Sequence, residues 1–326
     1  MENPFIDLRN LKTLFRIRRG MIRDLIEVKS FVHAVDDVSF TIRRGETFGL
    51  VGESGCGKTT LGRTMIRLVE PTAGEFFFDG RSVFDMAPET LRNLRKELQI
   101  IFQDPFASLN PRKTVYQIVA SPLRTHRMVN RSQVKERVLD LIEKVGLQRE
   151  HVDRYPHQFS GGQRQRIGIA RALATSPRFI IADEPLSALD VSIQAQILNL
   201  LEKLKEEFRL TYLFISHDLN AVSYFSDRVA VMYLGKLVEL ARAEIIFNGP
   251  VHPYSKALIS AIPSIRPGTH GKRIPMAGDV STPIDPPPGC RFQNRCVLKK
   301  GKICEGISPP WKEIEPEHYV ACHLFG

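Results

Sequence analysis

The sequence has no long apolar run and no secretory signal. No stretch reaches the roughly 18 consecutive apolar residues that a membrane-spanning helix requires. The first residues, MENPFIDLRN, also lack the apolar core of a signal peptide. We therefore expect a cytoplasmic chain that does not cross a bilayer by itself.

Cysteine is scarce, and no residue class dominates the composition. Hydrophobic residues make up 43% and charged residues 25% of the 326 positions, an ordinary globular mixture. This excludes a disordered chain, a collagen and a small disulfide scaffold. The length favours about two domains. The formal net charge of +10 favours anionic partners, which include nucleotides, nucleic acid and the anionic face of a membrane.

Cysteine and proline are concentrated near the C-terminus. Four of the five cysteines lie beyond Gly289, and 10 of the 21 prolines lie after Ile262. In a reducing compartment such clustered cysteines indicate a metal site rather than disulfides. We place a domain boundary near Pro263, which predicts a first domain over residues 1–262 and a second over residues 263–326.

Apolar runs alternate with longer helical patterns through the first 262 residues. Buried strands are expected at residues 47–51, 179–182 and 211–216, another strand at 98–102, and a strand followed by a turn at 74–80. Helices are expected at 58–68 and 191–208. This order predicts an α/β domain with a largely parallel sheet. The segment from about 104 to 173 has helical patterns and no strong strand pattern, so we expect a helical insertion there.

A glycine-rich segment follows the first of these strands. Residues 52–59, GESGCGKT, match the phosphate-binding loop pattern in full and lie between an expected strand and an expected helix. Glycines let successive backbone N–H groups wrap phosphates, and the N-terminus of the next helix adds its dipole. Lys58 would reach the β- and γ-phosphates and Thr59 would ligate Mg²⁺, whereas we interpret Cys56 as structural.

Paired carboxylates end another apolar run. Asp183 and Glu184 follow the four apolar residues 179–182. Ligands bind at the carboxyl ends of parallel strands, so Asp183 can hold Mg²⁺ while Glu184 faces the attacking water. An Asp-Glu pair alone is more often a helix cap, so its weight comes from the phosphate loop on the same chain.

Further motifs complete a family resemblance. The segment 159–166, FSGGQRQR, resembles the signature motif of ATP-binding cassette (ABC) proteins and precedes the Asp-Glu pair, as in that family. Gln103 in IIFQDP, the segment 187–190 and His217 in FISHD come in the order that the family shows. The resemblance covers residues 5–262. It implies a phosphate-loop NTPase cassette with a helical subdomain.

The resemblance also implies roles for individual residues. ATP would be bound by Phe31, Gly52, Glu53, Ser54, Gly55, Cys56, Gly57, Lys58, Thr59, Thr60 and Gln103. Phe31 is the candidate for stacking on adenine, with Phe15 as the second choice. Mg²⁺ would be held by Thr59, Gln103 and Asp183, and the catalytic residues would be Lys58, Gln103, Glu184 and His217. Two cassettes pack head to tail in this family, so the ATP of the partner subunit would be contacted by Ser160, Gly161, Gly162 and Gln163.

The C-terminal region resembles a narrower group. The segment HPYSKALISAIP, the proline-rich stretch and the cysteine array resemble the C-terminal extension of oligopeptide and dipeptide importer ATPases. In that group four cysteines look like ligands of a four-iron four-sulfur (4Fe-4S) cluster, here Cys290, Cys296, Cys304 and Cys322. A structural Zn²⁺ is an alternative, because thiolates bind both iron and zinc. Four free buried thiols are a second alternative.

These observations predict an ATP-hydrolysing subunit of an ABC importer for di- or oligopeptides or related solutes. The expected partners are a second, non-identical ABC ATPase subunit, two transmembrane permease subunits and an extracytoplasmic solute-binding protein. Nucleic acid is not expected as a partner. The chain would lie peripherally on the cytoplasmic face of the cell membrane.

Two other functions fit part of the sequence. A soluble cassette ATPase acting on nucleic acid or the ribosome would suit the positive charge. However, the sequence shows neither the coiled-coil or zinc-module insertions of repair cassettes nor the second cassette that ribosomal ones usually carry in the same chain. An iron–sulfur binding or sensor module that merely retains the cassette is disfavoured by the intact Glu184.

Overall fold

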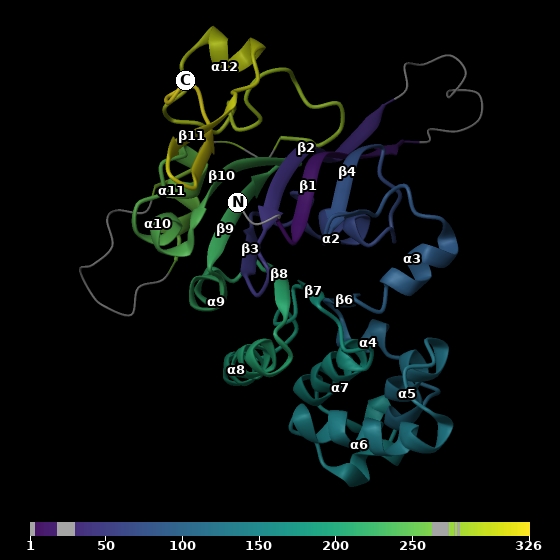
Figure 1. The fold of residues 1–326 in the computed structure, drawn as a ribbon. Helices are drawn as coiled ribbons and strands as arrows, with labels where there is room; N and C mark the ends of the chain where they lie inside the picture. The colour runs from purple at the N-terminus through teal and green to yellow at the C-terminus, as the bar shows by residue number, and fades with distance from the viewer. Residues whose placement is uncertain (1–3, 18–29, 263–273, 277, 279–280) are drawn as a thin grey trace. The chain divides into compact units, whose positions relative to one another are not determined.

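The computed structural model describes residues 4–17, 30–262, 274–276, 278 and 281–326 (Figure 1). By its internal contacts the chain forms two compact units. The first comprises Met1–Arg43, Phe48–Phe84 and His217–Gly326, and the second comprises Arg44–Thr47 and Asp85–Ser216. The boundary expected near Pro263 lies outside the described residues.

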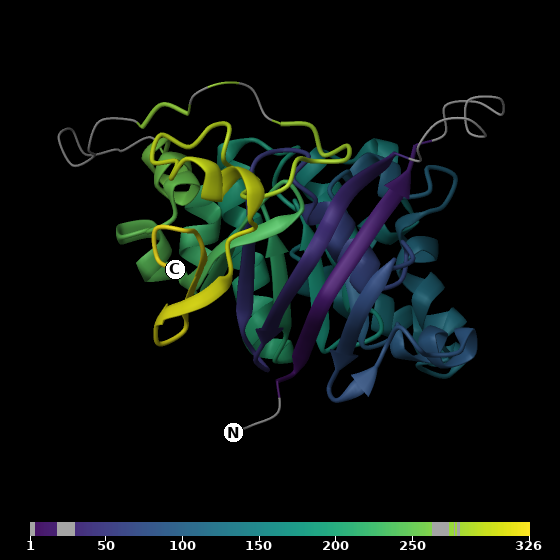
Figure 2. The same cartoon turned by 90° about the horizontal axis from the view of Figure 1, so that it is seen from above.

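The first unit contains an antiparallel sheet that sequence reasoning found only in part. Its strand order is β2-β1-β4-β5, and Figure 2 shows β1, β2 and β4 lying side by side. The strands are β1 (Ile6–Arg16), β2 (Phe31–Ile42), β4 (Ala73–Phe78) and β5 (Arg81–Ser82). The strand expected at 74–80 is confirmed as β4, whereas β1 and β2 were not predicted. Their alternation of buried and exposed residues is interrupted by bulges, which weakens the period-two signal.

A second group of strands in the first unit leads into the expected phosphate loop. β3 (Thr47–Val51) is buried at every residue and runs parallel to β9 (Arg228–Tyr233). β10 (Lys236–Arg242) is antiparallel to β9, β12 (His318–Ala321) is antiparallel to β10, and β11 (Trp311–Glu315) is antiparallel to β12. The C-terminal residues therefore extend this group of strands by two.

The described part of the first unit contains five helices. They are α2 (Lys58–Met65), α9 (Leu219–Phe225), α10 (Ala243–Asn248), α11 (Pro253–Ser260) and α12 (Lys302–Gly306). The helix expected at 58–68 ends at Met65, three residues early. Arg67 has a left-handed backbone with φ 51°, which a right-handed helix cannot contain.

A buried carboxylate joins the C-terminal strands to the rest of the first unit. Glu239 on β10 has no exposed surface and accepts hydrogen bonds from the amides of Val251 and His252 at 2.8 and 2.9 Å. His318 on β12 lies 2.9 Å from the same carboxylate through Nε2. These contacts fix β12 and the start of α11 against β10.

The second unit has three parallel strands and six α-helices. β6 (Leu98–Ile101), β7 (Phe179–Asp183) and β8 (Thr211–Ile215) pair in that order. Their apolar residues are buried on both faces, as expected for parallel strands. The strands expected at 98–102, 179–182 and 211–216 are thus confirmed, as is the helix expected at 191–208, which is α8 (Val191–Phe208).

The segment expected to be helical contains a series of helices. The helices of this unit before α8 are α3 (Pro88–Leu94), α4 (Pro105–Ser108), α5 (Val115–Thr125), α6 (Val134–Lys144) and α7 (Gly161–Leu173). Short 3₁₀ turns lie at η1 (Arg131–Gln133), η2 (Arg149–Asp153) and η3 (Pro156–Gln158). Among the described residues of the chain, no helix is both long enough and apolar enough to cross a membrane.

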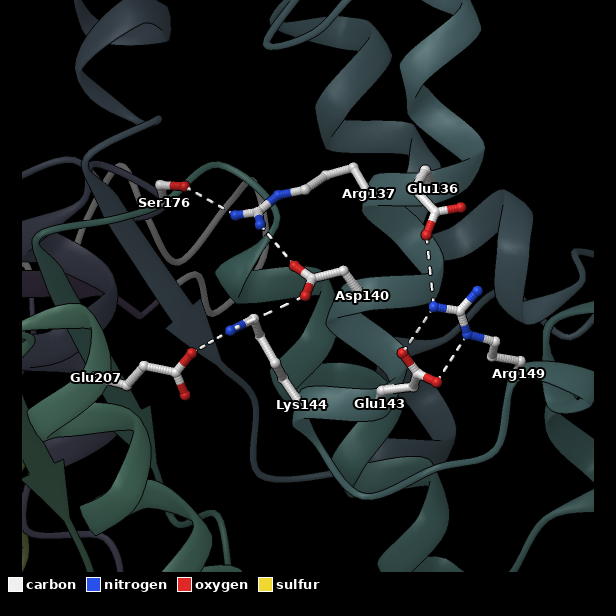
Figure 3. A network of polar contacts seen from close by, with 8 residues as sticks. All are labelled: Glu136, Arg137, Asp140, Glu143, Lys144, Arg149, Ser176 and Glu207. Carbon is white, nitrogen blue, oxygen red and sulfur yellow. Dashed lines mark hydrogen bonds and ion pairs between the residues drawn. The ribbon is translucent and has the colours of Figure 1, made fainter.

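A polar network ties α6 to its neighbours in the second unit (Figure 3). Arg137 bonds to Asp140 at 2.7 Å and to Ser176 at 3.3 Å, and Lys144 pairs with Glu207 at the end of α8. Exposed ion pairs of this kind contribute about 0.2–1 kcal/mol each. The network therefore orients α6 more than it stabilises the fold.

Candidate functional site

The glycine-rich loop between β3 and α2 has a backbone that only glycine adopts without strain. The φ angles are 151° at Gly52, 80° at Gly55 and 110° at Gly57. Two of these positions are also crowded. A Cβ at Gly52 would lie 2.2 Å from the carbonyl oxygen of Met232, and one at Gly57 would lie 2.0 Å from that of Ala34. Both the shape of the loop and its surroundings therefore require glycine.

Lys58 lies inside this loop. Its side chain is buried, and Nζ donates to the carbonyl oxygens of Gly52 at 2.8 Å and Glu53 at 3.1 Å. Cys56 Sγ lies 3.8 Å from the same Nζ, and burial raises the pKa of the Cys56 thiol, which keeps it protonated at neutral pH. The loop thus combines a held ammonium group, the N-terminus of α2 and inert cysteine packing, which suits the binding of phosphates.

The second unit brings Gln103 and Glu184 together. Gln103 Nε2, just beyond β6, donates to Glu184 Oε2 at 2.9 Å. Glu184 has φ 47°, a left-handed conformation that is costly for a residue with a side chain. Its amide donates to Ile215 O at 2.9 Å, and this bond helps hold the strained backbone. Asp183, the last residue of β7, is completely buried beside it.

Ser160 caps helix α7, which begins within the segment 159–166. Its Oγ accepts from the Gln163 amide at 3.4 Å, while Gln163 Oε1 accepts from the Ser160 amide at 3.1 Å, which forms a capping box. Gly162 is buried, and a Cβ there would lie 2.4 Å from Ile193 Cγ2. Ser160 is exposed and Gly161 is half-buried, so the N-terminus of α7 is open to a ligand.

Phe31 and His217 both belong to the first unit. Phe31 begins β2 and is half-buried, and its amide and carbonyl bond to the side chain and the amide of Asp285, each at 2.9 Å. Phe15, the second aromatic candidate, is 42% exposed. His217 is exposed just before α9, whose first turn is capped by Asp218.

The candidate residues are thus divided between the units. The phosphate loop, Phe31 and His217 lie in the first unit, and the second unit contains Gln103, Asp183, Glu184, Ser160, Gly161, Gly162 and Gln163. Sequence reasoning missed three residues that contact candidate site residues: Tyr254 and Arg295 bond to Glu53 in the glycine-rich loop, and Asp285 bonds to Phe31. They contact positions more than 200 residues away in the chain, and no local pattern marks such contacts.

The four C-terminal cysteines line one small cavity. Cys290, Cys296, Cys304 and Cys322 face it together with His252 and His323. Burial raises the pKa of the Cys290 thiol to about 11, and the neighbouring cysteines add to the effect. In the described parts of the chain, no group of three or more His, Cys, Asp and Glu residues is arranged to hold a metal ion. The expected iron–sulfur cluster is therefore not supported by this arrangement of the side chains.

Two protein-family models match the chain. Residues 35–187 match the model described as "ABC transporter". Residues 238–304 match the model described as "Oligopeptide/dipeptide transporter, C-terminal region". The second match includes the segment from β10 through Cys304.

Curated relatives align with the chain over almost its full length. The oligopeptide transport ATP-binding protein AppF of Bacillus subtilis is 51% identical over 99% of this chain and 98% of the relative. The dipeptide transport ATP-binding protein DppF of Escherichia coli is 45% identical over 99% of this chain and 95% of the relative. The similarity therefore includes the C-terminal region as well as the ATPase motifs.

Solved structures show the same fold. The dimeric post-hydrolysis structure of the ATP-binding cassette MJ0796, bound to ADP and Pi, has a TM-score of 0.64 and 29% identity over 73% of this chain and 98% of that one. The structure of cbiO1 from Clostridium perfringens, part of the transporter complex cbiONQ, has a TM-score of 0.65 and 26% identity over 76% of this chain and 92% of that one.

The crowding of the glycine-rich loop leads to a prediction with a matched control. Gly57→Ala should abolish ATP binding, because its Cβ would collide with the carbonyl oxygen of Ala34 and displace the start of α2. Gly55→Ala should weaken binding far less, because nothing lies within 4 Å of its Cβ and only about 1–2 kcal/mol of backbone strain is added. Titration with a fluorescent ATP analogue measures both. Equal effects of the two variants would contradict the steric account.

Proposed function

Because the chain belongs to the ABC transporter family, within its oligopeptide/dipeptide branch, we propose that it powers the import of di- or oligopeptides or related solutes. It is an ATPase, and its hydrolysis of ATP to ADP and phosphate is coupled to transport. The observation that carries the peptide branch is the full-length similarity to AppF and DppF, which includes the C-terminal region. The same coverage disfavours a cassette that acts on nucleic acid or the ribosome.

We propose the following division of labour at the ATP site. Lys58 and the glycine-rich amides hold the phosphates, and Glu184 polarises the attacking water. The hydrogen bond from Gln103 to Glu184 supports this role, because it aims the carboxylate and couples it to a residue after β6. His217 contacts the γ-phosphate and Phe31 stacks on adenine.

Mg²⁺ would be held by Thr59, Gln103 and Asp183. An amide oxygen, a hydroxyl and a carboxylate are oxygen donors of the kind that Mg²⁺ prefers, and Asp183 is the fully buried end of β7. When bound, the ion neutralises charge on the phosphates. The side chains of this chain set its position.

We propose that the working ATPase is a head-to-tail pair of cassettes. Ser160, Gly161, Gly162 and Gln163 would then contact the ATP held by the other subunit, and the open N-terminus of α7 supports this arrangement. The other subunit would be a similar but non-identical chain. Two permease subunits and an extracytoplasmic solute-binding protein complete the importer, with this chain peripheral on the cytoplasmic face.

For the cysteine array we propose a 4Fe-4S cluster held by Cys290, Cys296, Cys304 and Cys322. Four thiols around one cavity provide the donor set that such clusters use. When bound, the cluster would cross-link four segments of a region with little core of its own. A structural Zn²⁺ is the alternative occupant.

The importer itself can be tested by its composition and its stimulation. Purified from native membranes, the chain should bring with it a second cassette and two membrane subunits. In liposomes the complex should hydrolyse ATP faster when the peptide-loaded binding protein is added. Copurification with ribosomes or DNA, without membrane subunits, would contradict the proposal.

Removal of the proposed base should separate ATP binding from hydrolysis. Glu184→Gln should lower the turnover of the assembled complex about 10²–10⁴-fold, the usual contribution of a general base, while the affinity for ATP is kept. The closed pair of cassettes should accumulate on size-exclusion chromatography. Glu206→Gln makes the same chemical change on the exposed face of α8 and should have no effect. Wild-type turnover by Glu184→Gln would reject Glu184 as the base.

Metal analysis after anaerobic purification tests the cysteine site directly. We expect about four irons and four sulfides per chain, and a clear loss of both when any one of the four C-terminal cysteines is changed to Ser. Cys56→Ser is the matched control, since Cys56 lies in the phosphate loop and should leave the iron content unchanged. One zinc per chain would instead support the structural zinc site, and absence of both metals would overturn the proposal.

A further inference from the structure

The phosphate-loop residue Glu53 is held from outside the loop. Its carboxylate accepts two hydrogen bonds from the guanidinium of Arg295, at 2.7 Å to Oε2 and 3.1 Å to Oε1. Its amide donates to Tyr254 Oη at 2.9 Å, and its carbonyl oxygen accepts from Lys58 Nζ at 3.1 Å. The second residue of the loop is thus fixed through its side chain and both of its backbone polar groups.

Arg295 comes from the cysteine-rich region, directly before Cys296. Its side chain is only 8% exposed and that of Glu53 only 22%, so the pair is largely shielded from water. The guanidinium carbon also lies 5.9 Å from the centroid of the Tyr233 ring. Two parallel hydrogen bonds between a guanidinium and a carboxylate are among the strongest polar contacts in proteins and fix the orientation of both groups.

An aromatic cluster holds this segment in place. Phe292 is buried and packs against Tyr233, with ring centroids 5.3 Å apart, and against Tyr254, with centroids 5.4 Å apart. Tyr254 is the residue whose hydroxyl accepts from the Glu53 amide. The backbone carrying Arg295 is therefore anchored on the same residues that border the phosphate loop, and the guanidinium has a defined position.

We infer that Arg295 is a positioning residue for ATP binding, which holds the phosphate loop in its binding shape through Glu53. The inference rests on the proposed ATPase function and adds to it a residue from outside the ATP-binding motifs. It assigns the cysteine-rich region a direct part in nucleotide affinity.

The loop needs such an anchor for a physical reason. Gly52, Gly55 and Gly57 have wide conformational freedom when the loop is not held, so fixing the binding shape costs backbone entropy. When Glu53 is anchored, this backbone entropy is already lost during folding and does not weaken the binding of ATP. Without Arg295 the Glu53 carboxylate would be left half-buried beside incoming phosphates, and it would repel them.

A second buried arginine of the same segment provides the matched control. Arg291 lies four positions before Arg295 in the sequence. Its side chain is 9% exposed and pairs with Asp36 on β2. Its described contacts do not include the phosphate loop. Loss of Arg291 removes a buried ion pair of the same kind while Glu53 keeps its partner.

The test measures ATP affinity and turnover in the assembled complex for Arg295→Met, Arg295→Lys and Arg291→Met. Arg295→Met should raise the dissociation constant and the KM for ATP at least about tenfold, as expected for a displaced binding loop, with kcat changed less than about twofold. Arg295→Lys should recover part of the affinity, because it keeps the charge but not the two-pronged geometry. Arg291→Met should bind ATP within about twofold of wild type.

A double-mutant cycle with Glu53→Gln keeps the inference falsifiable if the single variants are also less stable. If Arg295 affects ATP binding only through Glu53, the effects of the two substitutions should not add. The double variant Glu53→Gln with Arg295→Met should then have a dissociation constant for ATP no higher than that of the single variant that binds ATP less tightly. Wild-type affinity in folded Arg295→Met, or an equal loss in Arg291→Met, would overturn the inference. Failure of the wild-type complex to bind ATP at all would instead reject the proposed function.

Discussion

The structure depends on one constraint, which is that the glycine-rich segment 52–59 must keep a backbone shape that residues with side chains cannot adopt. Gly52 and Gly57 meet this constraint with left-handed backbones, and the carbonyl oxygens of Met232 and Ala34 leave no room for a side chain. β3 and β9 supply the rigid base on which the loop stands, and Lys58 closes it from within. Tyr254 and Arg295, which both bond to Glu53, then hold the loop in a shape that it would not keep alone.

The chemistry-bearing motifs were readable from the sequence because each is local. The loop at 52–59, the carboxylates at the end of β7 and the segment 159–166 each occupy a few consecutive residues. β1 and β2 were missed because their pairing joins distant segments and their alternation is broken by bulges. The early end of α2 depends on the left-handed Arg67, which side-chain periodicity does not reveal. The Gln103 to Glu184 bond was also out of reach, because its partners lie 81 positions apart.

The cysteine-rich region is built into the first unit at several independent places. Asp285 bonds to both backbone groups of Phe31, Arg291 pairs with Asp36, and His318 reaches the buried Glu239. Two of these contacts lie on β2, the strand that carries the expected adenine platform. The region therefore contacts both the expected adenine side and the phosphate side of the nucleotide site. A metal centre among its cysteines would stiffen this whole surface rather than a separate appendage.

The contact between Arg295 and Glu53 also bears on how the protein matures during its synthesis. The two residues are 242 positions apart, so at about 5–20 residues per second the ribosome adds Arg295 roughly 12–50 s after Glu53. Throughout that interval the nascent loop has its glycines and Lys58 but lacks its outer anchor. If Arg295 positions the loop as inferred, full affinity for ATP is reached only after the segment that carries Arg295 has been synthesised and has packed against the loop.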